Sequence, residues 1–420
     1  MLATLRRKDF ALLWSAGLIS LTGDWLLLIA LPIYVYTLTR SIAVTSGVFI
    51  VESLPSVLLG SVAGVFVDRW DRRRTMLWAN LLQAAGLLPL LAVHSPRQLW
   101  IVYAVSVIEA VLALFFAPAE QALLPCLVDE ERLVVANSLT ALNGNLARLA
   151  GAPLGGVVAG LLGLGGAVFL DAASFLAAST LIGLISLPRT DAERAAGAGV
   201  AAPGVWIGVW REWADGLRLV RRARTVSTLF VITTVLAMAQ GLFVVLFIVF
   251  VSKVLQGGVT AIGLLRGVQA IGGLLGGLIV GVLGRRLPVA RLIGLGAILF
   301  GLIDLAIWNA PALLPAYALT LTVVLFIAIG LPAAGFLTGV TTLLQESVTD
   351  AYRGRVFGAY NTTSALAQLG GMALAGLLGD RLGVVLVLNG QAALYLVAGL
   401  LALALLPGSK ACCPRPGRGG

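Results

Sequence analysis

The chain has 420 residues, of which 59% are hydrophobic and 11% are charged. A soluble domain carries roughly 25% charged residues, so this composition excludes an ordinary soluble protein and indicates an integral membrane protein. The formal net charge of +10 lies beside apolar segments, where it sets topology, and no nucleic-acid partner is expected. Nothing near the N-terminus matches a cleaved signal peptide, so we expect the first helix to be retained.

Twelve apolar windows of about 20 residues, enough to cross the hydrocarbon core, follow one another along the chain. They are Leu12–Tyr36, Val44–Val67, Thr75–Val93, Leu99–Leu123, Asn137–Leu162, Gly165–Leu187, Val226–Val251, Thr260–Leu283, Val289–Trp308, Leu313–Leu337, Val356–Leu378 and Val384–Leu406. We therefore predict an all-α protein with twelve transmembrane helices. We expect it to lie in the lipid bilayer as a monomer.

The basic residues predict the orientation of these helices. With both termini in the cytoplasm, four Lys or Arg lie on the outer side and two lie within spans, and the remainder of the 29 are cytoplasmic. The outer four are Arg40, Arg97, Lys253 and Arg381, and the embedded two are Arg148 and Arg266. This asymmetry follows the positive-inside rule.

Two similar halves flank the longest polar break. We expect an N-terminal half at 1–188, a cytoplasmic linker with an amphipathic helix at 189–225, a C-terminal half at 226–407 and a cytoplasmic tail at 408–420. A shift of 220 positions aligns Val128 with Val348, Gly151 with Gly371 and Gly163 with Gly383. Two six-helix pseudo-repeats in parallel are one of the architectures of transporters, with binding expected between the repeats near the bilayer midplane.

The turn between the second and third spans is dense in charge. It resembles the signature of the major facilitator superfamily, Gly-x-x-x-Asp-Arg-x-Gly-Arg-Arg, through Gly64, Asp68, Arg69, Arg72 and Arg73, with Asp71 where Gly is usual. The segments Lys8–Trp14, Gly23–Trp25, Ala30–Pro32 and Leu124–Ser138 are similar to the bacterial branch of enterobactin exporters and macrolide efflux proteins. The resemblance covers nearly the whole chain, implies the major facilitator fold and a bacterial inner membrane, and does not identify the substrate.

A small-residue pattern in the fifth span is similar to the Gly-Pro-x-x-Gly-Gly antiporter motif. Gly151, Gly155 and Gly156 are in place, and Pro153 is one position late. Small residues let two helices approach closely, and Pro with Gly permits bending. The alternative interpretation is ordinary helix packing.

Ionisable residues within spans are functional candidates, because a charge is costly at the bilayer centre unless it is paired or wetted. Asp24, Glu52, Glu109 and Arg148 concentrate in the N-terminal half and predict a polar cavity. Asp24 is the first candidate for proton coupling and Glu109 the second, and Arg148 could hold a carboxylate ionised. For each, a buried structural role is the alternative; Asp171 is expected to be a satisfied interfacial residue.

The charged turn is expected to act as a cytoplasmic gate. Asp68 could meet the positive N-terminus of the eleventh helix, and Arg69 or Arg72 could pair with Glu120 at the inner end of the fourth span. Breaking and remaking such contacts would supply the bistable element that alternating access requires. The alternative is a loop that only sets topology.

In the C-terminal half, Gln240, Arg266, Gln269 and Asp304 are candidates to line the cavity, and Asp304 could instead pair with Arg266. Among the aromatic residues, Phe243, Phe247 and Phe250 could line a pocket or form core, and Trp308 near a span end is expected to be an interfacial anchor.

Together these patterns predict a secondary transporter that exports a small amphipathic molecule, drug or siderophore-like, in exchange for protons. A lysophospholipid flippase or a small-solute importer on the same fold is the alternative, and a membrane sensor is a third hypothesis. No phosphate-binding loop is present for ATP-driven transport. Neither enzyme chemistry nor a metal or other cofactor is expected, since His94 is the single histidine and Cys126, Cys412 and Cys413 lack ligand spacing.

Overall fold

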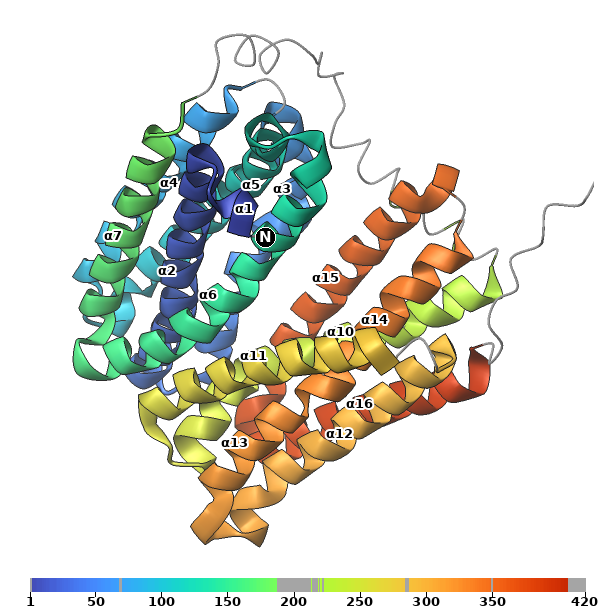
Figure 1. Ribbon diagram of the computed structural model, residues 1–420. Helices are drawn as coiled ribbons and strands as arrows, with labels where there is room; N and C mark the ends of the chain where they lie inside the picture. The colour runs from blue at the N-terminus through green and yellow to red at the C-terminus, as the bar shows by residue number, and fades with distance from the viewer. Residues whose placement is uncertain are drawn as a thin grey trace, which may run out of the picture. The chain divides into compact units, whose positions relative to one another are not determined.

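The computed structural model describes residues 2–67, 70–186, 223–283, 287–348 and 350–406, with Trp213, Arg218 and Val220. Within them every regular element is helical (Figure 1). The α-helices are α1 (Leu2–Leu5), α2 (Lys8–Thr39), α3 (Ile42–Val67), α4 (Arg72–Gly86), α5 (Leu99–Leu127), α6 (Leu133–Leu161), α7 (Gly163–Gly183), α10 (Arg224–Val249), α11 (Gly258–Leu283), α12 (Val289–Leu313), α13 (Ala318–Ala328), α14 (Gly330–Ser347), α15 (Asp350–Leu382) and α16 (Val384–Leu405). Most of the predicted linker, 189–225, and all of the tail, 408–420, lie outside the described residues.

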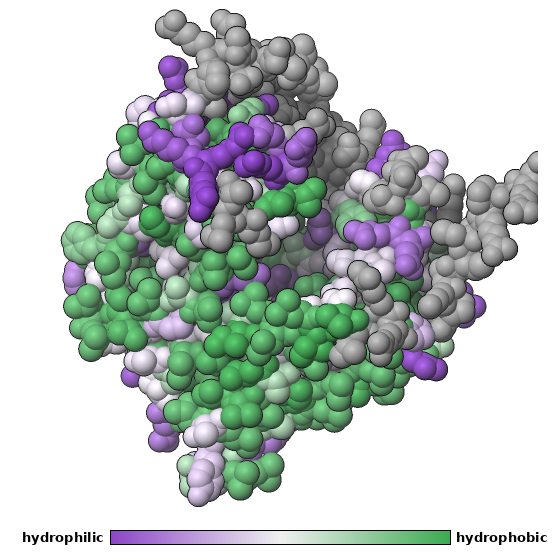
Figure 2. Space-filling view, in the orientation of Figure 1, coloured by the Kyte–Doolittle hydropathy of each residue, from purple (hydrophilic) through white to green (hydrophobic). Residues whose placement is uncertain are grey.

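The long helices account for the twelve predicted spans. Among the described residues, ten segments are long and apolar enough to cross a membrane. The other two predicted spans are the helices α6 and α15, which have 29 and 33 residues. Both are long enough to span, but polar and small residues lower their hydropathy. Apolar side chains cover the helix flanks, and hydrophilic ones gather at helix ends (Figure 2).

Several spans contain breaks at places that the sequence explains. The third span continues from α4 into the 3-10 helix η1 (Leu88–Ala92), which carries Pro89. The seventh ends in a π-helix, η4 (Phe250–Val254). The tenth is divided between α13 and α14, which meet at Ile329 and Gly330. Breaks of this kind are tolerated in membrane helices where neighbouring groups satisfy the freed backbone.

The chain forms two compact units, Met1–Ile207 with Val251–Gly267, and Gly208–Phe250 with Val268–Gly420. Within the first, α2 packs on α6 and α7, and α4 packs on α5 and α7. Within the second, α10 packs on α15 and α16, and α12 packs on α14 and α16. These pairings are equivalent under the 220-residue shift, so the pseudo-repeat predicted from sequence is a repeat of helix packing.

Two turns confirm the register of the repeat. Gly163 has φ +66° just before α7, and Gly383 has φ +85° just before α16. Only glycine adopts this region without strain. The two aligned glycines therefore allow the same left-handed backbone turn before equivalent helices. Val128 and Val348, another aligned pair, are both extended C-caps, of α5 and α14.

Candidate functional site

A polar cavity of about 200 Å³ lies within the first unit, among α2, α3, α4, η1, α5 and α7. Its polar lining residues are Asp24, Glu52, Gln83, Ser106, Glu109 and Asp171. Trp25 and several leucines supply the apolar part of the wall. We call it the carboxylate cavity, because four of its side chains are acidic and no lysine or arginine is among the described residues that line it.

Three of the predicted residues meet at this cavity. Asp24, Glu52 and Glu109 come from α2, α3 and α5 and line the same space. Asp24 lies within electrostatic reach of Glu52, and Glu109 within reach of Asp24. Three helices therefore converge on one acidic site within the membrane-spanning part of the protein.

The fourth predicted residue, Arg148 on α6, lies apart from the cavity wall. Its guanidinium carbon is 6.0 Å from the centre of the Trp25 ring, a cation–π distance. Its Nε is buried and makes no hydrogen bond. Trp25 itself lines the cavity. Arg148 therefore contacts the wall of the acidic site by a cation–π interaction with Trp25 rather than by an ion pair with Asp24.

Asp171 was assigned to the membrane interface from sequence, and that prediction is wrong. Its side chain is 1% exposed and lines the carboxylate cavity from α7. The Ser174 hydroxyl is shared between the Asp171 carbonyl, at 2.8 Å, and Asp171 Oδ1, at 3.3 Å. Gln83 was also missed. One signal was available, because Asp171 and Gln391 are 220 positions apart and are polar residues in mainly apolar helices.

Two glycines make room for two of the carboxylates. A Cβ at Gly86 would lie 2.7 Å from Glu109 Oε1, which is closer than real contacts allow. A Cβ at Gly23 would collide with Asp171 Oδ1 and with Ser174 Oγ. Glu109 Oε1 is buried without a hydrogen-bond partner. The acidic side chains thus lie directly against helix backbones.

The antiporter-like motif packs α6 against α2 beside Asp24. A Cβ at Gly151 would strike the carbonyl oxygen of Thr22, and one at Gly155 would lie 2.6 Å from that of Leu26. These two contacts bracket Asp24 along α2. Gly156 is also buried, and Pro153, which is half-buried, lies inside the helix. The structure therefore contains the close packing of α6 on α2 that was the alternative interpretation of this motif. An antiporter role of the motif stays a prediction.

At the N-terminal end of α4, side chains cap helix ends. Asp71 is the N-cap, and its Oδ1 accepts from the backbone N–H of Arg74 at 2.7 Å. Arg73 donates to the carbonyls of Ile182, at 3.0 Å, and Gly183, the last residues of α7. The departure from the superfamily signature at Asp71 therefore has a structural reason, since Asp is among the best N-caps.

Of the two arginines expected to pair with Glu120, Arg69 or Arg72, the structure describes Arg72, and it binds a backbone carbonyl. Arg72 donates to the carbonyl of Ala122 at 2.8 Å. Glu120 faces α2, where a Cβ at Gly17 would lie 3.2 Å from its Oε1. Arg72 also lies 3.6 Å from Cys126 Sγ, so its guanidinium is held against the last turns of α5. Asp68 and Arg69 lie outside the described residues, and Gly64 is placed only as part of α3.

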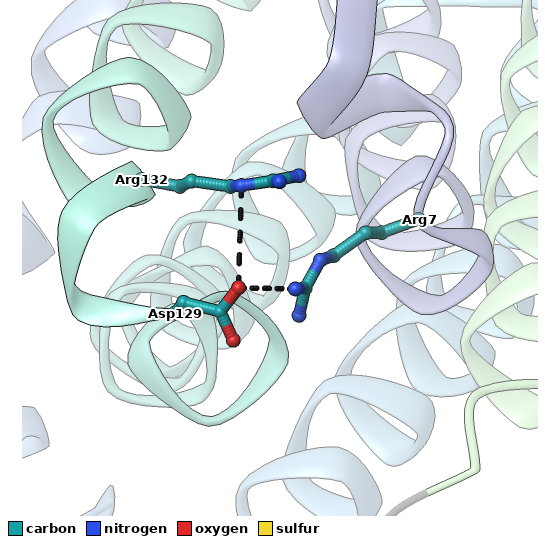
Figure 3. A network of polar contacts seen from close by, with 3 residues as sticks. All are labelled: Arg7, Asp129 and Arg132. Carbon is teal, nitrogen blue, oxygen red and sulfur yellow. Dashed lines mark hydrogen bonds and ion pairs between the residues drawn. The ribbon is translucent and has the colours of Figure 1, made fainter.

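The same end of the first unit carries an ion-pair network that the sequence did not reveal. Arg7, just before α2, pairs with Asp129, and Arg132 Nε lies 4.0 Å from the same carboxylate oxygen (Figure 3). Asp9 Oδ1 accepts from the backbone N–H of Ser186 at 3.0 Å. The start of α2 is thereby joined to the α5–α6 turn and to the end of α7.

The second unit holds its polar residues in a hydrogen-bonded set, the C-half cluster (Gln240, Asp304, Trp308, Gln391 and Tyr395). Gln391 Nε2 donates to Asp304 Oδ2 at 2.9 Å, and Trp308 Nε1 donates to Gln391 Oε1 at 3.2 Å. The Tyr395 hydroxyl donates to Gln240 Oε1 at 3.4 Å. The partner that the structure shows for Asp304 is thus Gln391. Of the other candidates, Arg266 and Gln269 are half-buried on α11.

Aromatic residues fill the space around this cluster. Trp308 is 1% exposed, so its assignment as an interfacial anchor is wrong. Its ring contacts Phe243 and Phe250, and Phe243 packs on Phe247. All three phenylalanines are buried, which makes them core of the second unit rather than the wall of a pocket.

Two six-helix repeats with a polar cavity inside the membrane-spanning part define a multi-pass transporter of the major facilitator type. The transmembrane secretion effector family model matches residues 1–412, and the chain belongs to that family of the major facilitator superfamily.

Similar proteins agree with this assignment. Macrolide efflux protein A of Streptococcus pyogenes is 26% identical over 90% of this chain and 91% of its own length. The multidrug efflux pump Tap of Mycolicibacterium fortuitum is 27% identical over the same shares. The nucleoside transporter NupG has the same fold, with a TM-score of 0.76 and 13% identity over 94% of this chain and 99% of its own.

Proposed function

We propose that the protein exports a small amphipathic molecule, drug or siderophore-like, from a bacterial cytoplasm in exchange for protons. The observation that carries this proposal is the carboxylate cavity, in which four acidic side chains share about 200 Å³ and no described basic side chain lines the wall. Carboxylates so placed are costly when ionised together. A proton or a cationic group of a cargo would relieve that cost, and competition between the two is the physical basis of exchange.

Asp24 is the proposed proton carrier. It lies on α2, which contacts both α6 and α7, and the packing of Gly151 and Gly155 brackets it. Any movement of α2 between inward-open and outward-open states would change the surroundings of its carboxyl group. Glu52 and Glu109 would share the proton or contact the cargo, and Arg148 would sense occupancy through Trp25.

The similar efflux proteins support the outward direction. The positive-inside pattern supports both termini in the cytoplasm, and with that orientation the capped end of α4 would lie on the inner side. There Arg72, Arg73 and Glu120, with Gly64, Asp68 and Arg69, would form the inner gate. We expect a monomer in the inner membrane, since each half buries its own polar residues.

The test is proton movement in proteoliposomes loaded in turn with ethidium, erythromycin or a catecholate siderophore. Wild type and Glu131→Gln, a neutralised carboxylate that is exposed and outside the cavity, should couple cargo to proton flux. Asp24→Asn should bind cargo without proton flux. Cargo movement without protons, or an unimpaired Asp24→Asn, would contradict the proposal; uptake would then favour an importer, and transfer of lysophospholipid would favour a flippase.

A further inference from the structure

Asp171 is the least expected member of the carboxylate cavity. Its carboxyl group is 1% exposed and comes from α7, whereas Asp24, Glu52 and Glu109 come from α2, α3 and α5. The residue lies against Gly23, directly beside Asp24 in the sequence. A side chain at position 23 would separate the two helices, so the contact depends on the glycine.

The charged side chains that line the cavity with Asp171 are all acidic, and the nearby cation, Arg148 of α6, lies behind the ring of Trp25. Asp171 lies within electrostatic reach of Asp24 and Glu109. α4 contributes the neutral Gln83, α3 contributes Glu52, and α6 contributes no titratable residue to the described wall. Several carboxylates in so small a space cannot all be ionised at once. Between them they must hold protons or a cation.

The equivalent position in the second unit shows what a purely structural polar residue looks like. There Gln391 lies 220 positions after Asp171 in the sequence and is fully buried. Its amide nitrogen donates to Asp304 and its amide oxygen accepts from Trp308. Among the described residues, the side-chain donor to the Asp171 carboxyl group is the Ser174 hydroxyl, at 3.3 Å, and that hydroxyl also donates to the Asp171 carbonyl at 2.8 Å. The carboxyl group faces a cavity, and it is therefore placed to exchange a proton with the cavity.

We propose that Asp171 is a second proton-binding residue of the transport cycle, paired with Asp24 across Gly23, so that two protons rather than one move for each cargo molecule. Each proton comes from water on the outer side, binds a carboxylate oxygen of the pair, and leaves to water on the inner side. This inference rests on the proposed function, because the second proton has a role only if the first is coupled to cargo.

The first experiment needs no cargo. Infrared difference spectra between acidic and alkaline buffer, recorded on the purified protein in lipid, report the C=O stretch of each carboxyl group that changes protonation. Asp171→Asn should lose one such band and Asp24→Asn another, whereas Glu131→Gln should retain both. Asn keeps the size of the side chain and an acceptor for Ser174. If Asp171→Asn does not fold, Ser174→Ala should shift the pH at which the same band changes. A spectrum that neither variant alters would overturn the proposal.

The second experiment counts protons released per ethidium or erythromycin bound, using the probe that wild type transports. Wild type should release two and Asp171→Asn one. An equal count in wild type and Asp171→Asn would overturn the role of Asp171 alone. A wild type that binds the probe and releases no protons would instead contradict the proposed function, and the two failures are therefore distinguishable.

Discussion

The two units place polar residues on equivalent helices and treat them in opposite ways. In the first, the amide Gln83 lies on α4 and the acid Asp171 on α7, around an open cavity. In the second, the acid Asp304 lies on α12 and the amide Gln391 on α16, joined by a hydrogen bond of 2.9 Å. The same packing of helices can therefore support either a reactive site or a satisfied core, and the difference lies in how many neighbouring groups are acidic.

The largest expected effect comes from neutralising one acid in each unit. Asp24→Asn should lower cargo-driven proton flux more than tenfold. This corresponds to a loss of about 1.4 kcal/mol or more of the coupling free energy between proton and cargo. Asp304→Asn should retain most of the flux, because Asn still offers an oxygen to Gln391. Proteoliposome flux normalised to folded protein measures both. Equal losses in the two variants would remove the functional contrast between the units.

A second test concerns the packing that brackets Asp24. Gly151→Ala would press a methyl group onto the Thr22 carbonyl and should lower the free energy of unfolding by about 3 kcal/mol, the upper range for overpacking. The matched control is Gly144→Ala on the same helix, where a Cβ meets nothing within 4 Å. Alanine there should be neutral or slightly stabilising. Thermal unfolding in detergent compares them, and similar midpoints would argue against close α2–α6 contact.

The satisfied state of the C-half cluster predicts a loss of stability rather than of coupling. Gln391→Leu leaves Asp304 and the Trp308 N–H buried without partners and should cost about 2 kcal/mol. The corresponding change in the first unit, Gln83→Leu, should alter the pH dependence of flux with a smaller effect on unfolding. The free energy of unfolding and the proton flux are measured on both variants. A changed proton stoichiometry in Gln391→Leu would contradict a purely structural role of the C-half cluster.

The smallest expected effect concerns the N-cap of α4. Asp71→Ala removes the acceptor of the Arg74 N–H and should cost about 1 kcal/mol of stability, whereas Asp71→Gly should cost only a few tenths. Because Asp71 caps the start of α4 and Gln83, the α4 residue of the carboxylate cavity, lies near the other end of that helix, neither variant should change proton stoichiometry. A large flux defect in Asp71→Gly, which restores the usual residue of the signature, would instead indicate a role of Asp71 in the gate.

Much of the fold could be predicted from local properties. Apolar length located the spans, although α6 begins at Leu133 rather than Asn137 and α15 at Asp350 rather than Val356. α15 starts in polar and charged residues, which a hydropathy window does not count, whereas α6 starts with the apolar run Leu133–Ala136, which the predicted span left out. The repeat was predictable because Gly163 and Gly383 mark turns that need a positive φ.

The site was less predictable than the fold. Asp24, Glu52 and Glu109 were found because a charge within an apolar span is conspicuous. Asp171 and Trp308 were misplaced because position along a helix does not tell which side of it a residue faces. The pairing of Arg69 or Arg72 with Glu120 stays a prediction; in this structure Arg72 donates to a backbone carbonyl, an acceptor that a sequence pattern of charges does not take into account.

The sequence by itself determined the membrane class, the number of spans, the repeat and the family, because these follow from hydropathy and from short motifs. Only the tertiary structure decided which polar residues share a cavity and which satisfy one another. Helix rotation and the backbone approach that glycine permits set those contacts, and neither can be read from hydropathy or from short motifs.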